Sequence, residues 1–196
     1  MNYRAVGHRC AVHLPSLDLP LTPKQIQTTL EKLNFFVLEL NMVSLARSFI
    51  GISHYRLGAT LNEAPDYFDC SSFTKYLYAH KGIWIPRLSI QQREKGVIVN
   101  CAARDDLVFT TGYRNFYDTD PHNNVGHVGI ATDEGTIIHA ADKYSGVIET
   151  TYTDFVQGNP RGFRRVVVPG TITLQCPDNL LVETSDDLRW LILKNI

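Results

Sequence analysis

The sequence has no long apolar run. Its 196 residues are 44% hydrophobic, yet the longest apolar stretches, such as residues 35–38, fall far short of the roughly 20 residues that a membrane helix needs. An apolar share of this size is typical of a globular protein that can bury a full core. We therefore expect a globular chain with no membrane span.

The sequence also lacks a surplus of charge of one sign. Lysine and arginine number 19 and aspartate and glutamate 20, for a net charge of -1. The cations are spread along the chain without a basic run, so nothing indicates a nucleic acid or an anionic membrane as a partner. His8, Arg9 and His13 interrupt the first twenty residues, which therefore lack the apolar core of a secretory signal. We expect a cytoplasmic protein, with another export route as the alternative.

Cysteine pairs of the Cys-x-x-Cys type are missing. The four cysteines are Cys10, Cys70, Cys101 and Cys176. Such wide spacing fits neither a disulfide framework nor a zinc ribbon, and we expect these thiols to be reduced and mostly buried. His8, Cys10 and His13 match no standard zinc spacing. No metal and no organic cofactor is expected.

The first half of the chain shows helical periodicity. Thr22 and Pro23 precede apolar residues spaced three to four apart, which predicts an N-capped helix. A second helix is predicted over residues 42–50, where Gly51 ends it. A third helix begins at Asp69 or Cys70 and ends before Gly82.

The second half alternates apolar and polar residues, as antiparallel strands do. The predicted strands are residues 107–109, 127–131, 136–140 and 162–168. Asp133-Glu134-Gly135 has the composition of a hairpin turn between the second and the third of these strands. Helices followed by a run of strands indicate an α+β domain. A further strand at 171–174 and a terminal helix at 188–193 are predicted, and the long loop between residues 110 and 126 is a candidate lid.

Cys70 lies where the third helix begins, in the stretch DCSSFTKYLY. Unsatisfied backbone N–H groups and the positive end of the helix dipole favour an anion there, so the thiolate is stabilised and the thiol pKa is expected to be lowered. The alternative is that Cys70 is a small buried hydrophobic residue. Its polar neighbours argue against that alternative.

Two histidines are suited to act on such a thiol. His127 opens one predicted strand and His139 lies near the end of the next, so both reach the same end of the hairpin. If the pairing is regular, both side chains lie on one face. A nucleophilic thiol needs a base and the base needs an orienting group, and this pair offers both.

Five segments resemble, in order, the motifs of the NlpC family of cell-wall cysteine peptidases. They are DCSSF at 69–73, IPRLSIQQ at 85–92, DLVF at 106–109, HVGI at 127–130 and IHA at 138–140. The resemblance implies a papain-like α+β fold in which helices pack on an antiparallel sheet. It covers residues 45–167, which predicts a catalytic domain at 41–168, an N-terminal extension at 1–40 with one helix, and a C-terminal extension at 169–196.

The resemblance also implies roles for the three residues. Cys70 would be the nucleophile, His127 the base and His139 the residue that orients the base. The implied reaction is hydrolysis of an amide bond in peptidoglycan stem peptides or muropeptides, between γ-D-glutamate and a diamino acid. An N-acetylmuramoyl-L-alanine amidase or an acyltransferase on the same scaffold is an alternative, as is a non-catalytic binding module.

Four further residues are candidates for substrate binding by the same resemblance. Tyr55 would help to bind the oxyanion or the substrate. Asp69 and Ser71 would hold the amino group of an N-terminal L-alanine, although Asp69 fits a helix N-cap equally well. Arg87 would pair with a substrate carboxylate or else brace its own loop.

Overall fold

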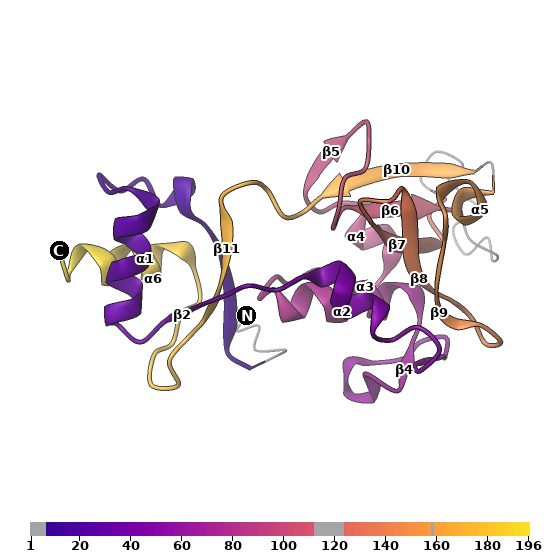
Figure 1. The fold of residues 1–196 in the computed structure, drawn as a ribbon, viewed down its shortest axis with the longest axis horizontal. Helices are drawn as coiled ribbons and strands as arrows, with labels where there is room; N and C mark the ends of the chain where they lie inside the picture. The colour runs from indigo at the N-terminus through magenta and orange to yellow at the C-terminus, as the bar shows by residue number, and fades with distance from the viewer. Residues whose placement is uncertain (1–6, 112–123, 158) are drawn as a thin grey trace. The chain divides into compact units, whose positions relative to one another are not determined.

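The structure is a computed structural model that describes residues 7–111, 124–157 and 159–196 (Figure 1). The chain divides into two compact units. One comprises residues 7–40, 78–84 and 168–196, and the other residues 41–77 and 85–167. Helices and antiparallel sheets occur in both, which confirms the α+β class.

The first unit is built from both ends of the chain. Its three-stranded antiparallel sheet has the order β1-β11-β2. These strands are Arg9–His13, Thr171–Gln175 and Phe36–Leu38, and the unit's helices are η1 (Leu14–Leu17), α1 (Pro23–Lys32) and α6 (Ser185–Leu193). Leu30, Phe35, Leu174 and Ile192 share one buried core. The two extensions predicted separately therefore fold together.

Helix α1 begins as its sequence predicts. The Oγ1 atom of Thr22 accepts the Gln25 N–H, and the Gln25 side chain accepts the Thr22 N–H in return, which completes a capping box. The structure adds β1 and β2 to the single helix predicted for the first forty residues. Strand β11 and helix α6 match the predicted C-terminal strand and helix, with α6 beginning earlier at Ser185.

None of the four cysteines, all of which lie in the described residues, forms a disulfide. Cys176 is buried in the core of the first unit, and its Sγ atom lies 3.2 Å from that of Cys10. The expectation of burial is wrong for Cys101, which is exposed because it lies in a bend after the edge strand β5 (Val97–Val99).

The second unit contains a six-stranded antiparallel sheet of order β5-β10-β6-β7-β8-β9. Its remaining strands are β6 (Leu107–Thr110), β7 (His127–Ala131), β8 (Thr136–Asp142), β9 (Gly146–Thr151) and β10 (Pro160–Arg165). Helices α2 (Met42–Arg47), α4 (Ser89–Gln92) and α5 (Tyr152–Val156), the turn η2 (Leu61–Glu63), and the short parallel strands β3 (His54–Tyr55) and β4 (Tyr67–Phe68) complete the unit.

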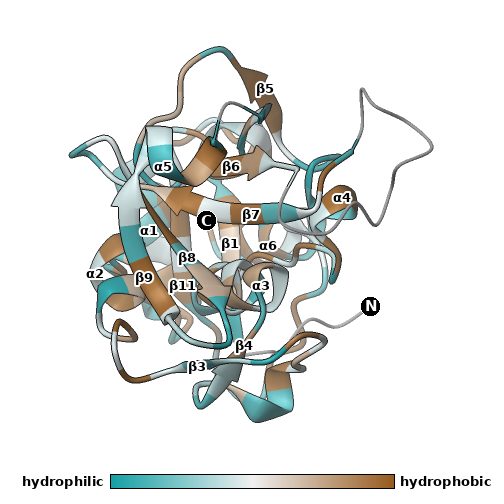
Figure 2. Cartoon of the chain, turned by 90° about the vertical axis from the view of Figure 1, so that its right-hand side faces the viewer, coloured by the Kyte–Doolittle hydropathy of each residue, from teal (hydrophilic) through white to brown (hydrophobic). Residues whose placement is uncertain are grey.

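Residues 70–77 of helix α3 (Cys70–His80) form the centre of this second unit. Phe73 and Leu77 are fully buried, and the Phe73 ring meets the rings of Phe49 and Phe68 edge-on. The apolar part of β7, brown in Figure 2, is buried as well. Helix α3 thus packs on Phe49, which follows α2, and on Phe68 of β4.

The predicted strands agree with β6, β7 and β8, and the predicted strand at 162–168 is found as β10, shifted toward the N-terminus. Strands β5 and β9 and helices α4 and α5 were missed. The candidate lid falls largely on residues 112–123, which lie outside the described residues.

No helix in the described part of the chain combines the length and the apolar content needed to cross a bilayer.

Candidate active site

Cys70 is the first residue of α3, and Asp69 caps this helix. The Oδ1 atom of Asp69 accepts the Ser72 N–H at 2.8 Å. The buried Cys70 Sγ atom lies 4.0 Å from the carbonyl oxygen of Gly126 and accepts a hydrogen bond from the Val128 N–H. The sulfur thus contacts the backbone immediately before and immediately after His127.

The ends of β7 and β8 leave space for this sulfur. In the described residues, β7 and β8 pair at two positions: Ile130 pairs with Ile138, and Ala131 pairs with Ile137. On its other edge β7 pairs with β6 at four positions, and the last pair is His127 with Thr110. Because alternate backbone groups of a strand point to its two neighbours, the Val128 N–H is directed toward the unpaired gap. Cys70 occupies that position.

His127 and His139 lie in direct contact. The Nε2 atom of His127 is 2.7 Å from the Nδ1 atom of His139, and the two ring planes are nearly perpendicular at 82°. Both side chains lie on the same face of the sheet. The distance is that of a good hydrogen bond.

Gly129 makes room for this contact. A Cβ atom on Gly129 would lie 2.5 Å from Cγ2 of Ile137 and 3.1 Å from Cβ of His139. Any side chain at this position would therefore push the β8 side chains away from β7. The glycine in HVGI is needed for close approach, not for an unusual backbone angle.

Two further residues hold the histidine pair, and sequence reasoning missed both. The Oγ1 atom of Thr150, on β9, lies 3.3 Å from Nε2 of His139. The buried Phe155 ring, on α5, packs against both imidazoles at centroid distances of 5.3 Å to His127 and 4.8 Å to His139. Neither β9 nor α5 was predicted, so no sequence signal pointed to these positions.

These contacts form a hydrogen-bond chain whose direction is set by the histidine tautomers. If Thr150 accepts the Nε2 proton of His139, then the Nδ1 atom of His139 is free to accept the Nε2 proton of His127. The Nδ1 atom of His127 then carries no proton and can accept one from the thiol. This is the tautomer that a general base needs.

Burial keeps the thiol and the imidazoles neutral. It raises the pKa of Cys70 to about 12, and the Asp69 charge adds to the rise, while the N–H groups of Val128 and Ser71 oppose it. It lowers the pKa of His127 to about 4 and that of His139 to about 3. The lowered thiol pKa expected from the helix start is therefore not found, because desolvation outweighs the helix N-terminus.

Asp69, Ser71 and Arg87 form a network beside the nucleophile. The Arg87 guanidinium binds both carboxylate oxygens of Asp69, at 3.1 and 2.5 Å, and donates to the Ser71 hydroxyl at 2.8 Å. It also donates to the Ala59 carbonyl, while the Gly58 N–H donates to Asp69. Arg87 therefore braces the start of α3, and Asp69 is the N-cap of that helix.

Tyr55 approaches the site from β3. It pairs with Phe68 of β4, which directly precedes Asp69. The structure thus brings Tyr55, Asp69, Ser71 and Arg87 to the N-terminal end of α3.

Residues 52–165 match the model of the NlpC/P60 family, more than half of the chain. The chain belongs to the NlpC/P60 family. A probable endopeptidase of Corynebacterium glutamicum is 35% identical over 111 residues, which are 55% of this chain and 46% of that protein. A probable endopeptidase p60 of Listeria innocua is 34% identical over 99 residues, 48% of this chain and 19% of that protein. The chain thus matches less than half the length of these relatives.

Solved structures of NlpC/P60 proteins share the fold. A family member from Bacillus cereus aligns with a TM-score of 0.54 and 27% identity over 64% of this chain and 39% of that one. The NlpC/P60 domain of the peptidoglycan hydrolase SagA aligns with a TM-score of 0.50 and 27% identity over 64% of this chain and 99% of that one. The second unit of this NlpC/P60 chain therefore has the papain-like cysteine peptidase fold.

Proposed function

We propose that this NlpC/P60 chain is a cysteine endopeptidase that hydrolyses an amide bond of peptidoglycan stem peptides, between γ-D-glutamate and a diamino acid. One observation carries the proposal. A hydrogen-bonded pair of imidazoles, His127 and His139, adjoins a thiol that contacts the backbone on both sides of His127. A thiol, a base and a group that orients the base are the components of cysteine peptidase chemistry.

Proton transfer starts the reaction. The Nε2 atom of His127 is engaged by His139, so Nδ1 takes the proton of the Cys70 thiol as the sulfur attacks the scissile carbonyl. Because burial favours the neutral thiol and imidazole, attack and proton transfer occur together once substrate is bound. The imidazolium then protonates the leaving amine, and water hydrolyses the thioester with His127 again as the base.

The developing oxyanion needs hydrogen-bond donors. The backbone N–H of Cys70, at the first turn of α3, supplies one, and the hydroxyl of Tyr55 on β3 supplies a second in this proposal. Such donors contribute about 3 kcal/mol each to transition-state stabilisation in related chemistry. Asp69 and Arg87 act here mainly by fixing the first turn of α3.

The relatives support peptidoglycan as the substrate class. Two are named endopeptidases, and a solved structural neighbour is named a peptidoglycan hydrolase. The proposal assigns the activity named for these relatives to a chain that matches only part of each of them. Intact wall and released muropeptides both contain the proposed bond, and the assay below separates them.

The test is cleavage of defined substrates. We expect the wild-type protein to convert L-Ala-γ-D-Glu-diaminopimelate peptides to L-Ala-D-Glu and the diamino acid, and Cys70→Ser to lose this activity. The matched control is Cys101→Ser, which removes an exposed thiol and should leave turnover unchanged. Parallel incubations with insoluble peptidoglycan and with soluble muropeptides identify the preferred form.

Three results would overturn the proposal. Cleavage of the N-acetylmuramoyl-L-alanine bond, or acyl transfer in place of hydrolysis, would indicate the alternative enzymes. Binding of the peptides by the wild-type protein without any turnover would indicate a non-catalytic module.

A further inference from the structure

Two thiols lie close together in the first unit. Cys10 is on β1, and Cys176 directly follows β11, the neighbouring antiparallel strand (Figure 1). Their Sγ atoms are 3.2 Å apart. Cys10 pairs with Leu174, and alternate residues along a strand point to the same face. Both cysteines therefore pack against the core of the first unit.

The gap between these two sulfur atoms is small enough to close. A disulfide bond is about 2.05 Å long, so the Sγ atoms need to approach each other by roughly 1 Å. Both cysteines lie near the end of the β1–β11 ladder, whose last pair is Arg9 with Gln175. The ends of strands open and shift more easily than the middle of a sheet. A movement of this size is therefore compatible with the strand pairing.

The two thiols differ in exposure. Cys10 is half-buried, whereas Cys176 is only 8% exposed. A dissolved reagent therefore reaches the Cys10 sulfur first, and Cys176 is placed to attack the product. The hydrogen bond with Cys176 raises the pKa of the Cys10 thiol, and burial raises it further. Because the thiolate is the attacking species, we expect Cys10 to react slowly at neutral pH and faster as the pH rises.

We propose that Cys10 and Cys176 form a site of thiol–disulfide exchange, which small-molecule disulfides convert to an intramolecular disulfide. The Cys10 thiolate attacks one sulfur of the small disulfide, forms a mixed disulfide and releases one small thiolate. The Cys176 thiolate then attacks the Cys10 sulfur, forms the bond between the two cysteines and releases the second small thiolate. The two protein thiols lose two electrons, and the small disulfide gains them and becomes two thiols that carry the two protons.

The disulfide would join the two ends of the chain covalently. It would close a ring from residue 10 to residue 176 that includes all residues of the second unit. A cross-link that closes a long loop restricts the unfolded chain and thereby stabilises the folded one. Strand β1 lies at the edge of the described three-stranded sheet, where it pairs with β11. The disulfide would also keep this edge strand from detaching.

Strand β1 also holds the chain just after α3. The Ala11 N–H donates to the Gly82 carbonyl at 3.2 Å. Gly82 passes so close to β1 that a Cβ atom on it would lie 2.6 Å from the Cα atom of Cys10. Local opening of β1 exposes the Ala11 amide hydrogen to solvent. A bond between Cys10 and Cys176 should therefore slow the exchange of this hydrogen.

The experiment treats the reduced wild-type protein with oxidised glutathione at mildly alkaline pH and then blocks the remaining thiols. Mass spectrometry of a non-reduced digest should find two peptides joined through Cys10 and Cys176. Cys176→Ala should stop at a mixed disulfide between Cys10 and glutathione. The cross-linked protein should unfold at a higher urea concentration than the reduced protein, and its Ala11 amide hydrogen should exchange about tenfold more slowly.

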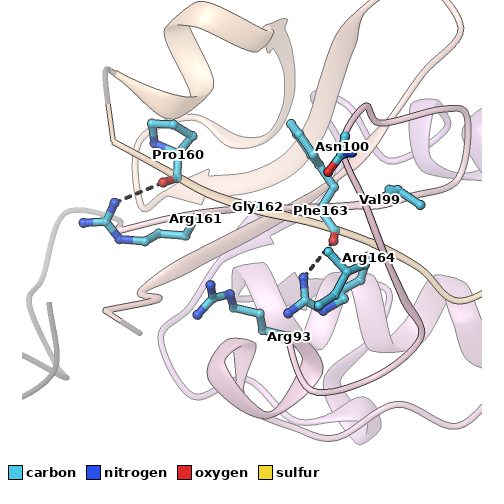
Figure 3. A pocket seen from close by; sticks show the side chains of 9 residues that line it. Arg93, Val99, Asn100, Pro160, Arg161, Gly162, Phe163 and Arg164 are labelled. Atoms are coloured by element: carbon cyan, nitrogen blue, oxygen red, sulfur yellow. Dashed lines mark hydrogen bonds between the residues drawn. The ribbon is translucent and has the colours of Figure 1, made fainter. Parts of the chain in front are cut away.

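Cys101 provides the matched control. It is exposed, and it follows Asn100, which lines a pocket of about 530 Å³ at the β5–β10 edge of the second unit (Figure 3). The Cys101 Sγ atom faces the Ala102 carbonyl at 3.7 Å rather than another sulfur. Glutathione bound to Cys101 should therefore remain a mixed disulfide, and Cys101→Ser should leave the bond between Cys10 and Cys176 unchanged.

The wild-type digest decides the proposal even if a variant fails to fold. Glutathione adducts on Cys10 without any cross-link to Cys176, or a Cys10 thiol that stays reduced after prolonged oxidation, would overturn it. Reaction of Cys176 in Cys10→Ser as fast as that of Cys10 in the wild-type protein would overturn the order of attack. A cross-linked protein with the urea midpoint of the reduced one would refute the stabilising effect.

Discussion

The Nε2 atom of His127 lies 2.7 Å from the Nδ1 atom of His139, and the other ring nitrogen of His139 faces the Thr150 hydroxyl. In the proposed mechanism, His127 acts on the thiol and His139 supports His127. Both rings also pack against the buried Phe155 ring. The orientation of His127 is thus set by contacts from β8, β9 and α5.

Replacing Thr150 tests whether its hydroxyl supports the histidine pair. Thr150→Val keeps the shape of the side chain but removes the acceptor for the His139 Nε2 proton. We expect kcat to fall about tenfold, because an unsatisfied buried donor costs about 1–3 kcal/mol, with KM unchanged. Thr150→Ser restores the hydroxyl and should recover most of the activity, and equal rates for the valine and serine variants would contradict the supporting role of the hydroxyl.

Gly129→Ala tests the close approach of β7 and β8. The added methyl group would collide with the side chains of Ile137 and His139. We expect a loss of about 1–3 kcal/mol in the free energy of unfolding and a fall in kcat of more than tenfold. The NMR signal of the proton shared by His127 and His139 should shift or disappear, and an unchanged signal would show that the histidine contact tolerates a side chain there.

The pH dependence of stability tests the burial of the histidines. Their folded pKa values, about 4 for His127 and about 3 for His139, lie below the ordinary value of 6.5. Between pH 6.5 and 5 the unfolded chain binds more protons than the folded one, so the free energy of unfolding falls as the pH falls. Each histidine contributes up to ~1.4 kcal/mol per pH unit.

His139→Gln isolates this contribution from that of other groups. Denaturant unfolding of the variant should show a slope against pH that is smaller by about one proton in this window. Identical slopes for the variant and the wild-type protein would mean that His139 is not kept neutral by burial.

Arg87→Lys tests whether Arg87 braces the nucleophile helix. A lysine keeps the charge but cannot bind both Asp69 oxygens and the Ser71 hydroxyl at once. We expect a loss of about 1–3 kcal/mol of stability together with reduced kcat. Arg104→Lys is the matched control, since its pair with Asp133 is exposed and worth about 1 kcal/mol or less. Equal effects of the two substitutions would refute the bracing role.

Much of the second unit could be predicted from local sequence. Apolar alternation predicted β7 and β8, and the polar string before Phe73 predicted the start of α3. The side chain of Asp69 then acts as the cap that its residue type favours. These features depend on neighbouring residues, which is why they can be read along the chain.

Other features depend on contacts between distant segments. Thr150 and Phe155 reach the histidines from β9 and α5, which lack a clear periodic signal. The pKa of Cys70 depends on how deeply tertiary packing buries the sulfur, which no local pattern reports. The contact of β1 and β2 with β11 likewise joins the two ends of the chain.

The most direct measurement of the central claim is covalent trapping of the nucleophile. The wild-type protein is incubated with an L-Ala-γ-D-Glu peptide that carries an electrophilic ketone in place of the scissile amide, and the labelled residue is located by mass spectrometry. We predict a single label on Cys70, slowed strongly by His127→Gln, with the exposed Cys101 unlabelled. Labelling of Cys101 in preference to Cys70, or a rate that does not depend on His127, would contradict the account.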